Sequence, residues 1–157
     1  MIDKVLVTKK EEIKPSHVGF HPAYEYDKFD VSHRNGGNRC AVIFYDIVPG
    51  KSSYPFHYHS DSEEIFYIIS GHGVVETNDG EIPVSQGSVV ICPPGENGAH
   101  KITNKLDSKI LTYIDIDTVP TVDMCVYPKS GKIGVFTKDG FAKLYKSGDA
   151  IGYYDGE

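Results

Sequence analysis

Short runs rich in Val, Ile, Tyr and Phe, separated by turn-forming residues, dominate this sequence. Its 16 glycines and 9 prolines are spread along 157 residues and interrupt the runs. Runs of this kind are typical of β-strands, and no long stretch has the periodicity of an amphipathic helix. The pattern therefore predicts an all-β sandwich or barrel rather than alternating strands and helices.

The strand candidates can be delimited by the turns between them. They are Cys40–Val48, Glu64–Ser70, Gly73–Thr77, Val89–Cys92, His100–Asn104 and Ile110–Ile116. Asn78-Asp79-Gly80 joins two such runs and can supply the positive φ angles of a tight hairpin. We therefore expect consecutive hairpins in the middle of the chain.

The length suits a single domain spanning residues 1–157. Residues 1–38 are mixed and polar, which predicts an N-terminal arm around a core formed by 39–118. Residues 119–157 contain a turn at 127–132, a strand-like run at 133–137 and a second turn at 138–140. We expect this C-terminal extension to pack on the core.

Charge and cysteine content exclude several classes of protein. The net charge is −6 and no block of Lys or Arg occurs, so nucleic acid and anionic membranes are poor partners. Neither a signal peptide nor a bilayer-spanning apolar run is visible, so we expect a cytoplasmic protein. Cys40, Cys92 and Cys125 are far apart and odd in number, so we expect three small buried side chains rather than disulfides.

Three histidines and one glutamate are candidate metal ligands. His57 and His59 are two residues apart, so a strand directs both imidazoles to one face. Glu64 follows a polar turn and opens the next strand candidate, and His100 opens a later one. Three imidazoles and one carboxylate suit a divalent transition metal (Mn, Fe, Ni, Co or Zn) rather than Ca or Mg, and four protein ligands leave coordination positions open.

An HxH pair alone is also compatible with two surface histidines. Here, however, the surrounding residues resemble both sequence motifs of the cupin superfamily, and the chain is similar to small single-domain microbial cupins. The first motif is matched by Gly50, His57, His59, Glu64 and Gly71, and the second by Gly87, Pro93, Gly95, His100 and Asn104. The chain departs from the pattern by one extra residue before His57 and two before His100, both in loop-like stretches.

The resemblance covers about residues 40–117. It implies a double-stranded β-helix, a jelly-roll-like barrel, with His57, His59, Glu64 and His100 as ligands of one divalent metal inside its mouth. Glu63 is the alternative carboxylate, and the six-residue gap to Gly71 favours Glu64.

Other residues are candidates for contact with a substrate. If Glu64 faces the interior, Phe66 and Ile68 share its side of the strand, and Ile102 shares that of His100. They line the cavity in one interpretation and are plain core residues in the other. Lys129 and Lys132 could offer ammonium groups to a carboxylate or phosphate, or be solvated loop lysines. No residue is assigned as a general acid or base.

The expected function is that of a divalent-metal-binding cupin. A metal-dependent enzyme would isomerise a sugar phosphate, or decarboxylate or dioxygenate a small organic acid. The alternatives are a non-catalytic module that binds or senses a small molecule or metal, and a barrel whose histidines bind nothing. Because cupins often pair through an N-terminal strand or the outer sheet, we expect a homodimer.

Overall fold

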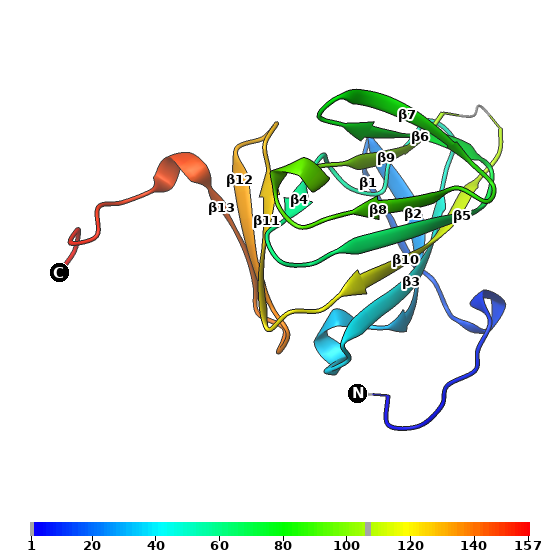
Figure 1. Ribbon diagram of the computed structural model, residues 1–157, viewed down its shortest axis with the longest axis horizontal. Helices are drawn as coiled ribbons and strands as arrows, with labels where there is room; N and C mark the ends of the chain where they lie inside the picture. Colours follow the sequence, from blue (N-terminus) through cyan, green and yellow to red (C-terminus); the bar gives the residue numbers. More distant parts are fainter. Residues whose placement is uncertain (1, 106–107) are drawn as a thin grey trace.

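The computed structural model describes residues 2–105 and 108–157 and is built from three antiparallel sheets (Figure 1). The six-stranded sheet contains, in spatial order, β1 (Ser16–His21), β2 (Tyr24–Ser32), β3 (Cys40–Ile47), β10 (Leu111–Thr118), β5 (Glu64–Ser70) and β8 (Val89–Cys92). The three-stranded sheet contains β7 (Gly80–Ser85), β6 (His72–Thr77) and β9 (Lys101–Asn104). The four-stranded sheet contains β13 (Ala142–Lys146), β12 (Lys132–Thr137), β11 (Val122–Tyr127) and β4 (Tyr58–His59).

Helical structure in the described part of the chain is limited to short 3₁₀ turns. They are η1 (Lys10–Glu12), η2 (Arg34–Gly36), η3 (Glu96–Gly98) and η4 (Ser147–Asp149). The prediction of an all-β, double-stranded β-helix is therefore confirmed. Among the described residues, no helix has the length and apolar character needed to cross a membrane.

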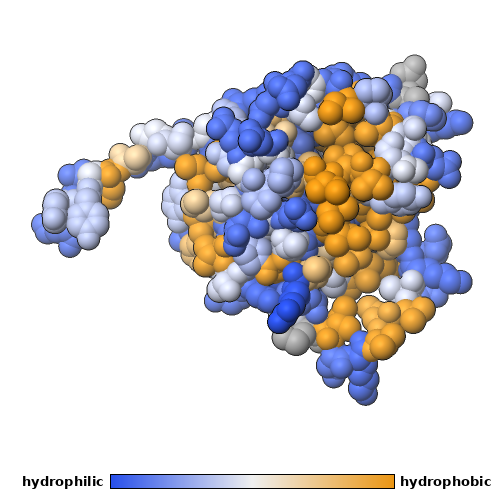
Figure 2. Space-filling view, viewed as in Figure 1, coloured by the Kyte–Doolittle hydropathy of each residue, from blue (hydrophilic) through white to orange (hydrophobic). Residues whose placement is uncertain are grey.

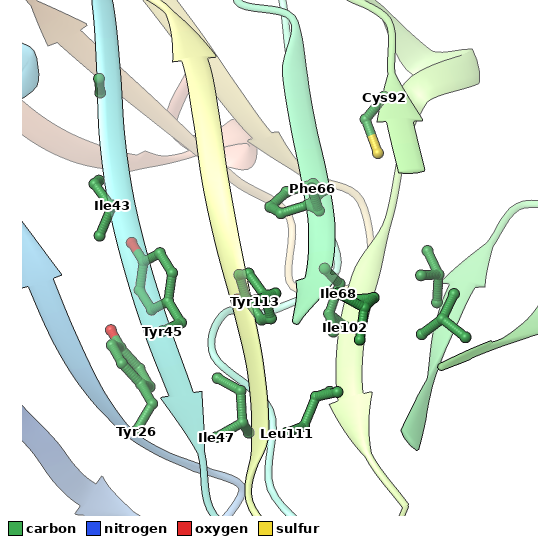
Figure 3. Packing of buried hydrophobic residues seen from close by; sticks show 13 residues of the cluster. Tyr26, Ile43, Tyr45, Ile47, Phe66, Ile68, Cys92, Ile102, Leu111 and Tyr113 are labelled. Carbon is green, nitrogen blue, oxygen red and sulfur yellow. The ribbon is translucent and has the colours of Figure 1, made fainter. Parts of the chain in front are cut away.

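The core lies between the six-stranded and three-stranded sheets, where alternate side chains of the central strands point inward (Figure 3). Ile47, Ile68 and Leu111 are completely buried there. Burial of each such aliphatic side chain contributes roughly 1.5–3 kcal/mol. Tyr45 and Tyr113 extend the same layer with their rings 5.2 Å apart. The core thus holds β3, β10 and β5 together beneath the barrel mouth.

The predicted strands match the observed ones within about two residues, and β6 and β7 form the hairpin expected at Gly80, whose φ is +121°. The structure also explains why position 71 is a glycine. Its φ is +88°, and a Cβ there would lie 2.5 Å from the carbonyl oxygen of Ile110. The arm before residue 39 contains β1 and β2, strands that the sequence analysis did not predict.

The C-terminal extension adds strands to the barrel mouth. β11 pairs with β12, and β12 with β13, so the predicted turns join consecutive antiparallel strands. β11 also pairs with β4, with Cys125 opposite His59 and Val126 opposite Tyr58. After β13 the chain runs away from the barrel (Figure 1). The extension is thereby attached directly to the strand that carries His59.

Candidate metal centre

The four predicted ligands lie close together at the barrel mouth. His57 and His100 face each other through two backbone hydrogen bonds, of 3.1 and 2.8 Å, and their ring centroids are 4.8 Å apart. The ring of His59 lies 5.2 Å from that of His57. All four side chains, including Glu64, are nine-tenths or more buried.

The carboxylate of Glu64 lies among the three imidazoles. Its Oε2 is 3.9 Å from Nε2 of His57 and 3.4 Å from Nε2 of His100, and its Oε1 is 3.5 Å from Nε2 of His59. The ligand atoms of His57, Glu64 and His100 lie within 4.8 Å of one another. The alternative carboxylate, Glu63, is half-buried just before β5 begins and is not in the group of neighbouring ligand atoms found among the described residues.

Each histidine uses its other ring nitrogen to donate a hydrogen bond away from the centre. Nδ1 of His57 donates to the carbonyl of Pro55 at 2.8 Å, and Nδ1 of His100 to that of Gly98 at 2.9 Å. Nδ1 of His59 donates to Asp123 at 2.5 Å. A carbonyl oxygen can only accept, so these contacts fix the tautomers and leave Nε2 for a metal. The donor set therefore fits a divalent transition metal.

Burial and neighbouring groups shift the pKa values of His57 and His59 in opposite directions. Burial, together with the nearby His100 and His59, lowers the pKa of His57 well below its ordinary value. Burial also acts to lower the pKa of His59, but the hydrogen bond to Asp123, with contributions from Cys125 and Glu64, raises it to about 10. Burial acts to raise the pKa of Asp123, but the hydrogen bond from His59 lowers it below the usual range. Without a metal, the contact between His59 and Asp123 thus favours the protonated imidazole and the ionised carboxylate, and a metal that binds Nε2 of His59 would displace the proton there.

A cavity of about 310 Å³ opens beside this centre. It is lined by residues of the barrel and of the extension: Lys28, Asp30, His33, Arg34, Ile43, Tyr45, Tyr54, His57, His59, Glu64, Asp115, Asp117, Val119, Pro120, Asp123, Cys125, Tyr127, Phe136, Thr137, Lys138, Phe141 and Ala142. The extension therefore supplies the part of the wall that begins at Val119.

The predicted substrate contacts occupy different positions. Phe66 and Ile102 line a much smaller space of about 10 Å³ beside His100. Ile68 is completely buried in the core. Lys129 is exposed, pairs with Glu76 and lies over the ring of Phe56, and the ammonium of Lys132 lies over the ring of Tyr127.

Several acidic and basic residues of the site were not found by the sequence analysis. Arg34 forms salt bridges with Asp117 at 3.0 Å and with Asp123 at 3.4 Å. Asp115, fully buried in the same region, has a pKa raised well above its ordinary value by burial and by the neighbouring Asp117 and Glu64. The sequence contained one clue to these acids. In Ile114-Asp115-Ile116-Asp117, strand alternation directs either the two isoleucines or the two aspartates toward the barrel interior.

The cysteines follow the sequence prediction only in part. Cys92 and Cys125 are buried, and burial, followed by the nearby Glu64 and Asp115, raises the pKa of Cys92 to about 12. Cys40 is exposed, so the prediction of a buried side chain is wrong there, because its side chain falls on the outer face at the start of β3. The sulfur of Cys125 lies within 4.8 Å of the ligand nitrogens of His57 and His59, a proximity that spacing alone did not reveal.

Comparisons with known proteins agree with this architecture. The family described as "Cupin domain" matches residues 43–117. An oxalate-binding protein of Thermotoga maritima is 33% identical over 77 residues, which are 49% of this chain and 64% of that protein. An uncharacterized protein of Methanocaldococcus jannaschii is 38% identical over 58 residues, 37% of this chain and 45% of that one. The chain thus spans less than two thirds of the length of each of these relatives.

Solved structures show the same fold over a larger part of the chain. A sugar phosphate isomerase from a cupin superfamily, from Silicibacter pomeroyi, has a TM-score of 0.80 at 17% identity, with 96% of this chain and 98% of that one covered. A predicted oxalate decarboxylase from Thermotoga maritima has a TM-score of 0.64 at 24% identity, with 73% and 100% covered. The family match over residues 43–117 and the shared fold together support a small cupin-type protein.

Proposed function

We propose that this cupin binds one divalent transition metal through His57, His59, Glu64 and His100. The supporting observation is that three imidazole Nε2 atoms and one carboxylate converge beside a cavity. This donor set suits Mn, Fe, Ni, Co or Zn, and four protein ligands leave coordination positions open. A metal bound there would polarise a substrate oxygen or, if redox-active, support oxidation.

We propose further that the protein is an enzyme acting on a small polar metabolite, either a sugar phosphate or a small organic acid. The cavity is large enough for such a molecule. Its wall carries both basic and acidic side chains, and Lys28 and Arg34 pair with Asp30 and Asp117, so Lys138 and a bound metal would hold the charge of an anion. The names of the similar solved structures suggest isomerisation or decarboxylation, and dioxygenation is a third possible reaction.

The residues of the chain would have separate tasks in this reaction. Phe136 and Phe141 in the cavity wall would exclude water from a bound substrate. Phe66 and Ile102 would shape the apolar floor beside His100. Ile68, Lys129 and Lys132 stay predicted substrate contacts on sequence grounds alone.

The test is turnover by the whole chain. Metal-free protein is reloaded with each candidate metal, and sugar phosphates and small acids, including oxalate, are followed by NMR. We expect metal-dependent turnover that His100→Ala abolishes and that His72→Ala, at an exposed histidine of β6, leaves unchanged. Tight ligand uptake without turnover, with every metal, would contradict an enzymatic role.

That last outcome would favour the second candidate function, a non-catalytic module that binds or senses a small molecule or metal. The observation in its favour is the similarity of half of this chain to a protein named for oxalate binding. Calorimetric titration of the reloaded protein with oxalate distinguishes the two functions, because a binding module gives a saturable heat and unchanged oxalate.

We also propose that the protein is a cytoplasmic homodimer. The dimer is supported by apolar side chains on the outer face of the six-stranded sheet, over β5 and β8, which form a continuous patch (Figure 2). Tyr67, Val89 and Ile91 are 45–60% exposed there. The face of an antiparallel sheet that meets water is normally polar, so this face fits contact with a second copy.

A further inference from the structure

Three carboxylates form a cluster next to the histidines. In the pairing of β5 with β10, Glu64 stands directly opposite Asp117, and Asp115 follows on the same inward face two residues away. Each of the three offers an oxygen, and these oxygens lie within 4.8 Å of one another. Like charges placed directly opposite each other across two strands destabilise a sheet unless something compensates them.

Two oxygens of this cluster lack a hydrogen-bond partner within the described residues, although Asp115 and Asp117 also interact with each other. Oδ1 of Asp115 and Oδ1 of Asp117 are fully buried and lack a hydrogen-bond partner there. The cross-strand neighbours of Asp115 are Phe66 on β5 and Ile43 on β3, which have no polar side-chain atoms. A buried polar atom without a partner costs about 1–3 kcal/mol, and charged atoms cost more.

Arg34 compensates the cluster only in part. Its guanidinium donates to Oδ2 of Asp117 at 3.0 Å, whereas Glu64 lies among the imidazoles, so Arg34 bonds directly to only one of the three carboxylates. The contact orients Asp117 so that one oxygen faces Arg34 and the other remains unpaired. Both aspartates also line the 310 Å³ cavity, so a species that enters it meets this cluster.

We propose that Glu64, Asp115 and Asp117 form a second divalent-cation site, adjacent to the histidine centre. Its donors are carboxylate oxygens only, which Mg²⁺ and Ca²⁺ prefer and imidazole-seeking metals do not. A cation that bonds oxygen at roughly 2.0–2.6 Å can reach three oxygens spaced as these are. The site shares Glu64 with the proposed transition-metal centre, but its own donors are Asp115 and Asp117, and it goes beyond the proposed function.

Cation uptake tests this site without any assay of activity. Chelator-treated protein is titrated by calorimetry with Ca²⁺ and, separately, with Mg²⁺. We expect the native chain to bind one equivalent of at least one of these ions and its unfolding temperature to rise with that ion. Asp115→Asn/Asp117→Asn, which keeps side-chain shape and removes both charges, should lose the uptake and the rise.

Two further variants make the result specific. Asp46→Asn alters an acid on the outward face of β3, where it pairs with Lys10 and Thr112, and should bind the ion as the native chain does. His57→Ala should keep Ca²⁺ or Mg²⁺ uptake while losing the transition metal, so failure of the histidine centre can be told apart from failure of this site. Absence of Ca²⁺ and Mg²⁺ uptake by the native chain, or equal uptake by the Asp115→Asn/Asp117→Asn variant, would overturn the proposal.

Discussion

Asp123 links the C-terminal extension to the histidine pair. It lies on β11, is almost fully buried, and accepts hydrogen bonds from Nδ1 of His59, from Ser60 and from the backbone of Asp61. These bonds hold the His59 ring with Nε2 directed toward Glu64. Asp123 is thus a positioning residue for a proposed ligand rather than a ligand itself.

Replacing this carboxylate should weaken metal binding without removing a ligand. For Asp123→Asn we expect transition-metal affinity to fall about 10–100-fold, because the orientation and basicity of His59 depend on the carboxylate. Competition with a chromophoric chelator measures the change. Asp27→Asn, at an exposed acid on β2 that pairs with His17, is the control. Equal affinity for the native and Asp123→Asn chains would show that Asp123 has no role in holding His59.

The sequence made the proposed ligands visible but not their supports. His57, His59 and Glu64 are neighbours along the chain, so strand period and motif spacing suffice to group them. Asp123 is 64 residues from His59, and Arg34 is 83 residues from Asp117. Contacts of that separation follow from sheet pairing, which the spacing of one sequence does not reveal.

Glu76 connects three elements of the fold. It lies on β6 and pairs with Lys101 on β9 at 2.7 Å and with Lys129 in the turn between β11 and β12. Hydrogen bonds from Lys101 and Lys129 lower the pKa of Glu76, against the smaller opposing effect of burial. This cluster attaches the C-terminal extension to the three-stranded sheet.

Stability should therefore depend on pH through Glu76. Since its pKa is lower in the folded than in the unfolded state, its contribution is complete above the unfolded-state pKa and is lost as the pH falls through the folded-state pKa. We expect Glu76→Gln to reduce the free energy of unfolding by about 0.2–1 kcal/mol at pH 7. Urea titrations at pH 7 and at pH 3 measure this. A difference between the two chains that persists undiminished at pH 3 would contradict an ionic origin.

Strands were predictable where one face is buried and turns are explicit. β3 alternates buried and half-buried residues along its length, and Gly80 marks the β6–β7 turn. β2 was missed because its burial is mostly intermediate and its sequence mixes charged with aromatic residues. β4 has only two residues, and it is defined by pairing with β11 rather than by local composition.

The outer face of the six-stranded sheet carries two continuous apolar rows. Strand register aligns them across β3, β10, β5 and β8 as Val42, Ile116, Ile65 and Ile91, and as Phe44, Ile114, Tyr67 and Val89. The inward positions of the same strands form the core, so the sheet is apolar on both sides. A sheet of this kind is normally covered on both faces.

A charge in this face should prevent the proposed dimer. We expect the native chain to sediment as a dimer and Val89→Asp/Ile91→Asp to sediment as a folded monomer, because a contact between copies would have to bury the new carboxylates unpaired. Val122→Asp, at a 52% exposed position of β11, should stay dimeric. A native chain that is monomeric at all concentrations in analytical ultracentrifugation would contradict the proposal.

The metal content of the whole protein tests the proposed centre most directly. Elemental analysis compares untagged native protein, purified without added metal, with His57→Ala/His59→Ala and with His21→Ala/His72→Ala, a control pair of exposed histidines. We predict near-stoichiometric Mn, Fe, Ni, Co or Zn in the native and control chains and loss of that metal in the His57→Ala/His59→Ala chain. Equal metal in all three chains, or no metal and no uptake on reconstitution, would contradict the assignment of His57, His59, Glu64 and His100 as a metal centre.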